Sequence, residues 1–393
     1  MKKVYIRTFG CQMNDHDSDL VIGQFLAHGY KLTENKKEAD VVLLNTCSVR
    51  QHAEDRVFSE LGALKKLKSV PPKFAPANLS RGDNHPAEKI IGVIGCMAKN
   101  LGKKIIERAP YVDLVIGPND LSHIYDYVKQ IREKRKKIVE IDSAARDKSF
   151  YKNLYHRDKK HAYVNISEGC SNFCSYCVVP YVRGLQRSRP AKDILDEIKK
   201  LTKDGVSSVT LLGQNVNDFG SKQENINFVE LLNLISGIKG IKELSFLTLH
   251  PKDIDFRLFD LMAKKKNILK YLHLPIQSGS NRILKLMNRK YTKEKYLKII
   301  KEFHKKIPNG VIATDVIVGF PTETEEDFQD TLDLMNKVKF NFAYIFKYSP
   351  RPHTKAQNLS DDIPKEEKQR RHQILLNLQR GISRTKKVRI KIF

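Results

Sequence analysis

Residues 168–177 read Glu168-Gly169-Cys170-Ser171-Asn172-Phe173-Cys174-Ser175-Tyr176-Cys177, with three cysteines at C-x3-C-x2-C spacing. Simple electron-transfer iron–sulfur cubes take four cysteine ligands. Three thiolates on a four-iron cube leave one iron open, and an open position is typical of metal sites that do chemistry. Phe173 and Tyr176 are expected to shield such a cluster from water. Two other interpretations are a zinc knuckle, without an evident fourth ligand nearby, and a disulfide with one spare cysteine.

The segments around this stretch alternate between strand and helix. The expected strands are 163–166, 208–212, 243–248, 271–274, 311–318 and 342–348, and the expected helices between them are 191–203, 228–238, 253–264, 281–288, 292–305 and 325–337. Six strands of this kind predict a barrel or partial barrel rather than a small open sheet. The polar and Gly/Pro-rich loops follow the strands, at the face where barrel enzymes carry their chemistry.

The other three cysteines each follow a predicted strand in the N-terminal part of the chain. Cys11, Cys47 and Cys96 come after the strands 4–9, 40–44 and 90–94, and the helical patterns 18–28, 52–67 and 101–109 come next. Strands that alternate with helices predict a parallel sheet, whose post-strand loops share one ligand-binding edge. The three thiols can therefore converge on a second three-thiolate cluster. The alternative is three unrelated buried cysteines, which are common as small hydrophobic side chains.

Length and composition indicate two α/β domains. A fourth strand-like segment at 112–116 and a helix near 121–133 complete the first domain, an open parallel sheet. We expect this domain over residues 1–140, a basic linker over 141–160 and the barrel domain over 161–385, and 393 residues suffice for two separate cores. Residues 69–88 carry four prolines, at Pro71, Pro72, Pro76 and Pro86, and are expected to form an exposed loop.

The formal net charge of +26 points toward a polyanionic partner such as nucleic acid, or else reflects a generally Lys-rich solvated surface. The basic stretch 129–160 likewise allows phosphate contact, or a solvated helix face followed by a linker. Six cysteines in so long a chain are not the density of a secreted disulfide scaffold. No apolar run reaches the roughly 18 residues of a membrane span, and no signal peptide is evident. We therefore expect a cytoplasmic protein that does not associate with membranes.

Several motifs spread over nearly the whole chain are highly specific in combination. They are Thr8-Phe9-Gly10-Cys11-Gln12-Met13-Asn14, Asn45-Thr46-Cys47-Ser48-Val49-Arg50, Ile94-Gly95-Cys96-Met97-Ala98, Gly213-Gln214-Asn215-Val216-Asn217, His273-Leu274-Pro275-Ile276-Gln277-Ser278-Gly279-Ser280 and Tyr348-Ser349-Pro350-Arg351-Pro352. With them the chain resembles the radical S-adenosylmethionine methylthiotransferases, and within these the tRNA-2-methylthio-N6-dimethylallyladenosine synthase (MiaB) family.

The resemblance implies a radical-SAM partial (β/α)6 barrel and two [4Fe–4S] clusters. Cys170, Cys174 and Cys177 would be the catalytic trio, holding the cluster whose open iron binds S-adenosylmethionine. Cys11, Cys47 and Cys96 would hold the second cluster, whose open iron carries the sulfur to be inserted. The implied reaction converts N6-isopentenyladenosine next to the tRNA anticodon to its 2-methylthio derivative, with one S-adenosylmethionine for the radical and one as methyl donor. The implied partners are tRNA and an electron donor such as a flavodoxin or ferredoxin, and we expect a monomer.

Further candidates lie on the expected barrel rim or follow the barrel cysteines in the sequence. Candidates for contact with S-adenosylmethionine or substrate are Gln214, Asn215, Gln277, Ser278 and Gly279, and the alternative is that they are turn residues that satisfy the local backbone. Candidates for pairing with a carboxylate or a phosphate are Arg183, Arg187 and Arg189. His250 and His273 are assigned no ligand role.

The chain also departs from the family pattern. Relatives usually have Glu at Gln186, Ser at Leu249 and Gly at Thr322, and they continue into a small RNA-gripping β-barrel, the TRAM domain. Residues 386–393 are expected to be only the start of that domain, which bears on RNA affinity because backbone contacts dominate such binding. Two alternatives stay open: the same chemistry on threonylcarbamoyl-adenosine in tRNA or on a ribosomal-protein Asp, and a non-catalytic relative that binds metal or RNA.

Overall fold

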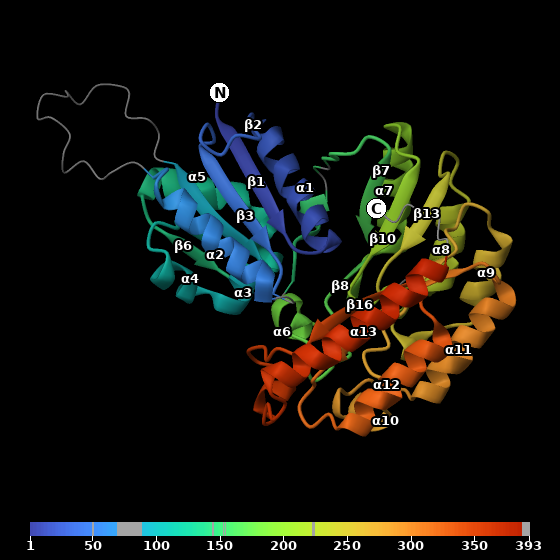
Figure 1. Ribbon diagram of the computed structural model, residues 1–393. Coiled ribbons are helices and arrows are strands. Elements are labelled where there is room, and N and C mark those ends of the chain that lie inside the picture. The colour runs from blue at the N-terminus through green and yellow to red at the C-terminus, as the bar shows by residue number, and fades with distance from the viewer. Residues whose placement is uncertain are drawn as a thin grey trace, which may run out of the picture. The chain divides into compact units, whose positions relative to one another are not determined.

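The structure is a computed structural model that describes residues 1–48, 51–68, 89–143, 145–151, 153, 155–221 and 225–386. The chain forms two compact units, one of Met1–Arg157 with Tyr181–Gly184, the other of Asp158–Pro180 with Leu185–Phe393. Figure 1 labels their elements. The proline-rich segment 69–88 and the expected start of a TRAM domain, apart from Lys386, lie outside the described residues.

A six-stranded sheet, in the order β2-β1-β3-β4-β5-β6, forms the first unit, and every neighbouring pair is parallel. The strands are β1 (Lys3–Phe9), β2 (Lys31–Leu32), β3 (Val41–Thr46), β4 (Ile90–Gly95), β5 (Leu114–Ile116) and β6 (Ile138–Glu140). Every residue of β3 and β4 is buried. This burial explains their continuous apolar sequences, since a parallel sheet is covered on both faces. The predicted open parallel α/β domain is confirmed.

Helices cover both faces of this sheet (Figure 1). Leu43 of β3 packs in a core with α1 (Gln12–Ala27) and α5 (Ile124–Lys134). Its neighbours Val42 and Leu44 point to the opposite face, as successive strand residues do, and pack in a core with α2 (Gln51–Lys65), α3 (Cys96–Leu101) and α4 (Lys103–Arg108).

Two helices of this unit differ from the sequence prediction. Helix α1 begins at Gln12 rather than near Ser18, because its first two turns bury polar residues such as Asp17 that interrupt the apolar pattern. The helix expected at 101–109 is the shorter α4, and a separate helix, α3, precedes it from Cys96. Gly102, with a φ of 49°, separates the two. The segment expected to be a linker packs on this unit, since Phe150 is buried in the core that contains α1.

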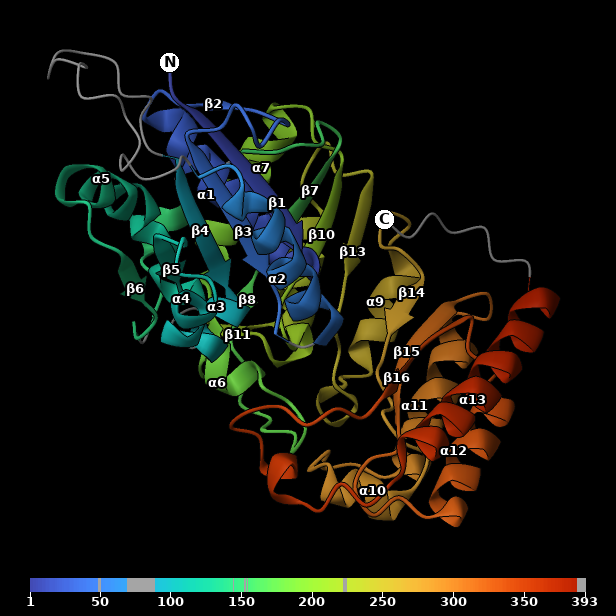
Figure 2. The same ribbon diagram turned by 60° about the vertical axis from the view of Figure 1, so that its left-hand side comes forward.

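The second unit has six parallel strands that follow one another in chain order (Figure 2). They are β7 (His161–Asn165), β10 (Ser208–Leu212), β13 (Glu243–Phe246), β14 (Tyr271–His273), β15 (Val311–Val318) and β16 (Phe342–Lys347). A parallel bridge between Leu244 and Ile268 connects the first three strands to the last three. No pairing joins β16 to β7 within the described ranges, so the predicted partial barrel is confirmed.

The helices of this unit follow the strands and bury one large core. They are α7 (Ala191–Lys203), α8 (Phe228–Ser236), α9 (Arg257–Lys264), α10 (Asn281–Leu286), α11 (Lys293–Lys306), α12 (Glu325–Val338) and α13 (Lys365–Thr385). Helix α6 (Val179–Arg183) begins in this unit, but its residues from Tyr181 onward belong to the first unit. Thr324 and Asp327 form a capping box that starts α12. Two short antiparallel pairs join β8 (Ser167–Glu168) to β9 (Arg187–Ser188) and β11 (Gly220–Ser221) to β12 (Ile226–Asn227). Among the described helices, none has the length and apolar character needed to cross a membrane.

Candidate functional site

The three N-terminal cysteines come together at one edge of the first unit's sheet. The last residues of β1, β3 and β4 lie side by side in the sheet, because Thr46 pairs with both Phe9 and Gly95. Cys47 and Cys96 come directly after β3 and β4, and Cys11 comes after β1 with one residue between them. The Cys47 thiol hydrogen-bonds with the thiols of both Cys11 and Cys96. All six cysteines of the chain are free thiols, so neither trio contains a disulfide.

The hydrogen bonds among these thiols shift their pKa values in opposite directions. They raise the pKa of Cys47 well above its usual value. The bond from Cys47 lowers the pKa of Cys11 to about 7 and that of Cys96 to about 6, although desolvation of the sulfurs opposes both shifts. Arg183 lowers both pKa values further. Two of the three thiols thus ionise readily near neutral pH, and the thiolate is the form that binds metal.

Two buried amides, which were not among the predicted site residues, fix the loops that carry these thiols. Asn14 Nδ2 donates to Asn45 Oδ1 (3.1 Å), and Asn45 Nδ2 donates to the Asn14 carbonyl (2.9 Å). Gly95 has a φ of 91°, and a Cβ there would lie 2.4 Å from Asn45 Oδ1. A glycine before Cys96 is therefore required by both the backbone conformation and the close approach of this amide.

A buried ion-pair network lies beside the N-terminal trio. Arg183 Nε donates to Cys96 Sγ (3.2 Å), and its Nη2 donates to Asp17 Oδ2 (2.8 Å). Asp17 Oδ1 accepts from Arg146 Nη1 at 2.7 Å. Asp17 is fully buried, and the side chains of Arg183 and Arg146 are 4% and 2% exposed. Burial alone would raise the pKa of Asp17, but the two guanidinium groups outweigh it and hold that pKa below its usual value.

The second trio lies on the loop between β8 and α6 in the barrel unit. The loop curls tightly, with positive φ angles of 74° at Gly169 and 48° at Phe173. The end of α10 clamps it, because Ser175 N donates to the Met287 carbonyl (3.0 Å) and Asn288 Nδ2 donates to the Phe173 carbonyl (2.9 Å).

The surroundings of Cys170 and Cys177 in this second trio raise their pKa values. Burial, reinforced by the sulfurs of Cys174 and Cys170, raises the pKa of Cys177 to about 12. Burial also raises the pKa of Cys170. Metal ligands must be deprotonated, so these thiols would lose their protons when a positively charged metal group arrives. The pKa values of Cys11 and Cys96 in the first trio are thus lowered, whereas those of Cys170 and Cys177 in the second trio are raised.

The rim residues Gln214 and Asn215 follow β10 at the same end of the barrel. Asn215 Nδ2 donates to Asp253 Oδ2 at 2.8 Å. The side-chain oxygens of both residues, like Nε2 of His250 after β13, are buried without a hydrogen-bond partner in the described part of the chain. Buried polar groups are nearly always hydrogen-bonded, so this rim has unused polar groups for a ligand.

The loop after β14 carries the other three rim candidates. Gln277 continues the strand, since its N–H donates to the Asp315 carbonyl (2.9 Å) and its carbonyl accepts from Ile317 N–H (2.9 Å). Gly279 N donates to Thr331 Oγ1 (2.9 Å), and the Ser278 hydroxyl lies 3.4 Å from the same oxygen. Ser278 and Gly279 thus fasten the loop to α12 and position the loop containing Gln277.

The three arginines that follow the barrel cysteines all pair with carboxylates. Arg183 pairs with Asp17, Arg189 Nη2 lies 2.6 Å from Glu197 Oε2, and Arg187 lies 4.0 Å from Glu168. The sequence left open whether carboxylate or phosphate would be their partner. The structure gives each of them a carboxylate.

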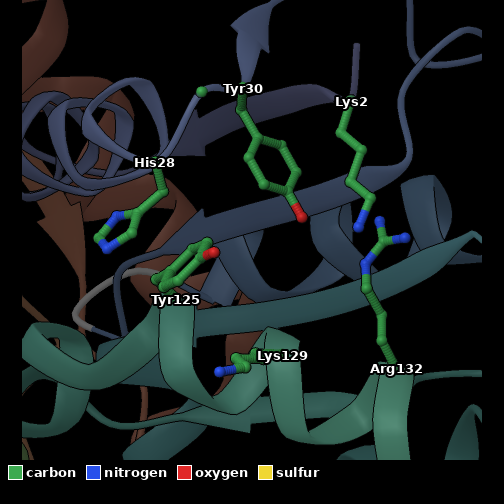
Figure 3. Close-up of a pocket in the computed structure, with 7 residues that line it drawn as sticks. Lys2, His28, Tyr30, Tyr125, Lys129 and Arg132 are labelled. Carbon is green, nitrogen blue, oxygen red and sulfur yellow. The ribbon is translucent and has the colours of Figure 1, made fainter.

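A cationic pocket of about 150 Å³ lies at the opposite edge of the first unit's sheet, where β1 and β2 begin (Figure 3). Its lining residues are Lys2, His28, Gly29, Tyr30, Tyr125, Lys129 and Arg132, with no acidic side chain among them. Lys2, Arg132 and the Tyr30 hydroxyl point toward one another. The rings of His28 and Tyr125 are stacked, with centroids 3.6 Å apart. The pocket therefore has the chemistry of an anion site with an aromatic wall.

Within the described residues, no three or more His, Cys, Asp or Glu side chains are arranged around one point as ligands of a single metal ion. In a four-iron cube each thiolate binds a different iron, so its three sulfurs need not converge on one point.

Comparison with known proteins places both units in known families. The profile described as "Uncharacterized protein family UPF0004" matches residues 3–117, and that of the Radical SAM superfamily matches residues 164–335. A protein of Desulforamulus reducens named tRNA-2-methylthio-N(6)-dimethylallyladenosine synthase is 42% identical over 385 residues, which are 97% of this chain and 81% of that protein. A Bacillus subtilis protein of the same name is 40% identical over 389 residues, which are 98% of this chain and 73% of that protein.

A solved structure shares the fold. The radical S-adenosylmethionine methyltransferase TsrM from Kitasatospora setae, with cobalamin and a [4Fe-4S] cluster bound, superposes with a TM-score of 0.61 at 12% identity. The superposition covers 91% of this chain and 77% of that one.

Proposed function

Because the chain belongs to the tRNA-2-methylthio-N6-dimethylallyladenosine synthase family of radical SAM enzymes, we propose that it methylthiolates tRNA. The proposed reaction converts N6-isopentenyladenosine next to the anticodon to its 2-methylthio derivative. One S-adenosylmethionine provides the radical and a second provides the methyl group. The observation that carries this proposal is the pair of cysteine trios, each at the carboxyl end of the strands in its own parallel sheet.

The residues of the chain fit the cofactors of this family, two [4Fe–4S] clusters and S-adenosylmethionine. We propose that Cys170, Cys174 and Cys177 hold the cluster of the barrel. Cys11, Cys47 and Cys96 hold the second cluster. Each trio supplies only soft thiolate ligands, which suit iron–sulfur clusters, and three thiolates leave one iron of a cube open. When bound, these groups supply the radical, the inserted sulfur and the methyl group.

The barrel rim supports binding of S-adenosylmethionine by the proposed residues. The unpaired side-chain oxygens of Gln214 and Asn215 can accept hydrogen bonds from amino or ribose hydroxyl groups. Gln277 is held on the same rim by its strand pairing, and Ser278 and Gly279 hold its loop against α12. The chain's own residues thus orient the cofactor and keep water away from it, while the cofactor carries out the chemical step.

The cationic pocket of the first unit supports contact with the RNA backbone. Lys129 and Arg132 come from the basic stretch whose role the sequence left open, and Lys2 joins them. Lys129 lies 4.0 Å from the Glu133 carboxylate, but the residues that line the pocket carry no acidic side chain. Such a lining suits a phosphate, and electrostatic contacts supply most nonspecific RNA affinity. A base can stack on the paired rings of His28 and Tyr125. We assign a backbone phosphate of tRNA to this pocket.

The same proposal includes the cell compartment and the partners. Because its proposed substrate is tRNA, the protein acts in the cytoplasm. A low-potential donor such as a flavodoxin or ferredoxin would deliver the electron. The chain contains a complete trio in each unit and needs no second copy to complete either, which supports action as a monomer.

Anaerobic turnover with an isopentenylated anticodon stem-loop tests the function directly. The reconstituted protein should produce the 2-methylthio nucleoside and deoxyadenosine, both detected by mass spectrometry after nuclease digestion. A stem-loop with threonylcarbamoyl-adenosine in place of the isopentenyl group is the control substrate. Product on the control alone would replace the proposed acceptor, and absence of deoxyadenosine with both substrates would support the non-catalytic alternative.

A further inference from the structure

Arg289 is a buried cation beside the cysteine trio of the barrel, and no step of the reaction described above uses it. It is 5% exposed and follows α10 at the point where that helix clamps the cysteine loop. Its Nη1 donates to Cys174 Sγ (3.3 Å) and lies 3.4 Å from the Tyr176 hydroxyl. Its Nε donates to the Tyr291 hydroxyl (3.0 Å), and its Nη2 donates to the Pro275 carbonyl (3.0 Å).

Among the residues that the structure describes, the hydrogen-bond partners of this guanidinium include no carboxylate. Two phenols and a carbonyl are neutral at physiological pH, because a free tyrosine ionises only near pH 10. The Cys174 sulfur is the one partner that metal binding converts to an anion. This arrangement differs from that of Arg183, whose charge is balanced by Asp17 in the first unit.

A buried charge without a counter-charge is costly, and arginine cannot lose its proton inside a protein. Folding therefore retains a positive charge whose hydrogen-bond partners among the described residues are two phenols, a carbonyl and a thiol. An anionic group bound by the three thiols would relieve that cost. The group that the proposed function puts there, an iron–sulfur cube with thiolate ligands, has this character.

We propose that Arg289 is the counter-cation of the barrel cluster, a positioning residue that holds Cys174 and favours the reduced state of the cluster. This inference rests on the proposed function only for the identity of the cluster. Reduction adds one electron from a low-potential one-electron donor and one unit of negative charge. A fixed positive charge in hydrogen-bond contact with a ligand sulfur stabilises that state more than the oxidised one.

The test measures the reduction potential of the barrel cluster alone. Cys11, Cys47 and Cys96 are replaced by alanine so that one cluster remains, and the reconstituted protein is titrated anaerobically with EPR detection. In this background Arg289→Gln removes the charge and retains polar contacts, and Arg289→Lys retains the charge. Arg257→Gln is the control, because that arginine is 64% exposed and paired with Asp255.

Arg289→Gln should lower the equilibrium constant for one-electron reduction about tenfold, which makes the potential about 59 mV more negative. Arg289→Lys should shift it by less than half as much, and Arg257→Gln should leave it unchanged. Equal shifts for Gln and Lys, or an unchanged potential for Gln at full iron content, would overturn the proposal. If Gln fails to retain iron, retention by Lys supports the charge role, and loss by both variants rejects it.

A second measurement uses protein without metal. Arg289→Met removes the uncompensated cation, so the apo protein should unfold at a temperature equal to or above that of the parent. Cluster loading should then raise the unfolding temperature less in the variant than in the parent. A variant that is less stable without metal and gains as much from loading would show that Arg289 only ties the loop together. A parent protein that loads no cluster would instead count against the proposed function.

Discussion

Replacing Asp17 by asparagine should destabilise the first unit far more than an ordinary loss of one charge. Asp17 is fully buried between Arg146 and Arg183, at 2.7 and 2.8 Å. Asparagine has nearly the same shape but no charge, so the substitution removes the carboxylate that both buried guanidinium groups contact. Removing one partner of a buried ion pair costs about 3–5 kcal/mol.

A matched control lies in the same unit. Glu60 also bridges two cations, Arg7 at 2.9 Å and Lys36 at 2.5 Å, but those side chains are 42% and 31% exposed. Exposed ion pairs contribute about 0–1 kcal/mol, so Glu60→Gln should cost no more than about 1 kcal/mol. Asp17 and Glu60 each pair with two cations, so a difference between the two variants measures the effect of burial and not of the number of ion pairs.

Amide hydrogen exchange of α1, followed by mass spectrometry, suits this comparison because a two-unit chain need not unfold in one step. Since 1.4 kcal/mol is a factor of ten, Asp17→Asn should accelerate the slowest amides of α1 by about two to four orders of magnitude. Glu60→Gln should accelerate them less than about tenfold. Similar effects of the two variants would refute the assignment of Asp17 as the centre of a buried network.

Three further predictions concern single residues. Cys174→Ala should abolish deoxyadenosine formation, whereas Cys47→Ala should spare it and stop sulfur insertion; equal loss of cleavage in both folded variants would contradict this division. Thr322 has a φ of 68°, so Thr322→Gly should stabilise the protein by about 1 kcal/mol and raise its unfolding temperature by roughly 2–4 °C; a lower temperature would show that the site is unstrained. Arg132→Ala should weaken tRNA binding and reduce the salt slope by about one, whereas the exposed Lys104→Ala should do neither; equal slopes for both would remove the phosphate assignment.

The sequence predicted the sheets best, because a strand that is buried on both faces has an apolar residue at nearly every position. The uniformly apolar sequences of β3 and β4 reflect a parallel sheet covered on both faces, and the cysteines that follow them had to reach one edge. Convergence of Cys47 and Cys96 could therefore be expected from topology alone. The partial barrel was predicted from the same alternation of strands and helices.

Buried polar residues explain where the prediction failed. Helix α1 begins earlier than expected because Asp17 is buried by ion pairing, which leaves no apolar periodicity to recognise. The partners of Arg183 and Arg289 depend on contacts with residues that are 166 and 115 positions away, and local sequence carries no signal for these. The contact of Arg289 with a cysteine could not be inferred from its charged neighbours, which resemble any solvated segment.

Iron and sulfide analysis combined with Mössbauer spectroscopy on anaerobically reconstituted protein tests the two-cluster account most directly. The intact chain should contain about eight irons in two cubes. Replacement of Cys11, Cys47 and Cys96 by alanine should leave about four, and so should replacement of the barrel trio. A single cube in the intact chain, or zinc in place of iron, would contradict the account.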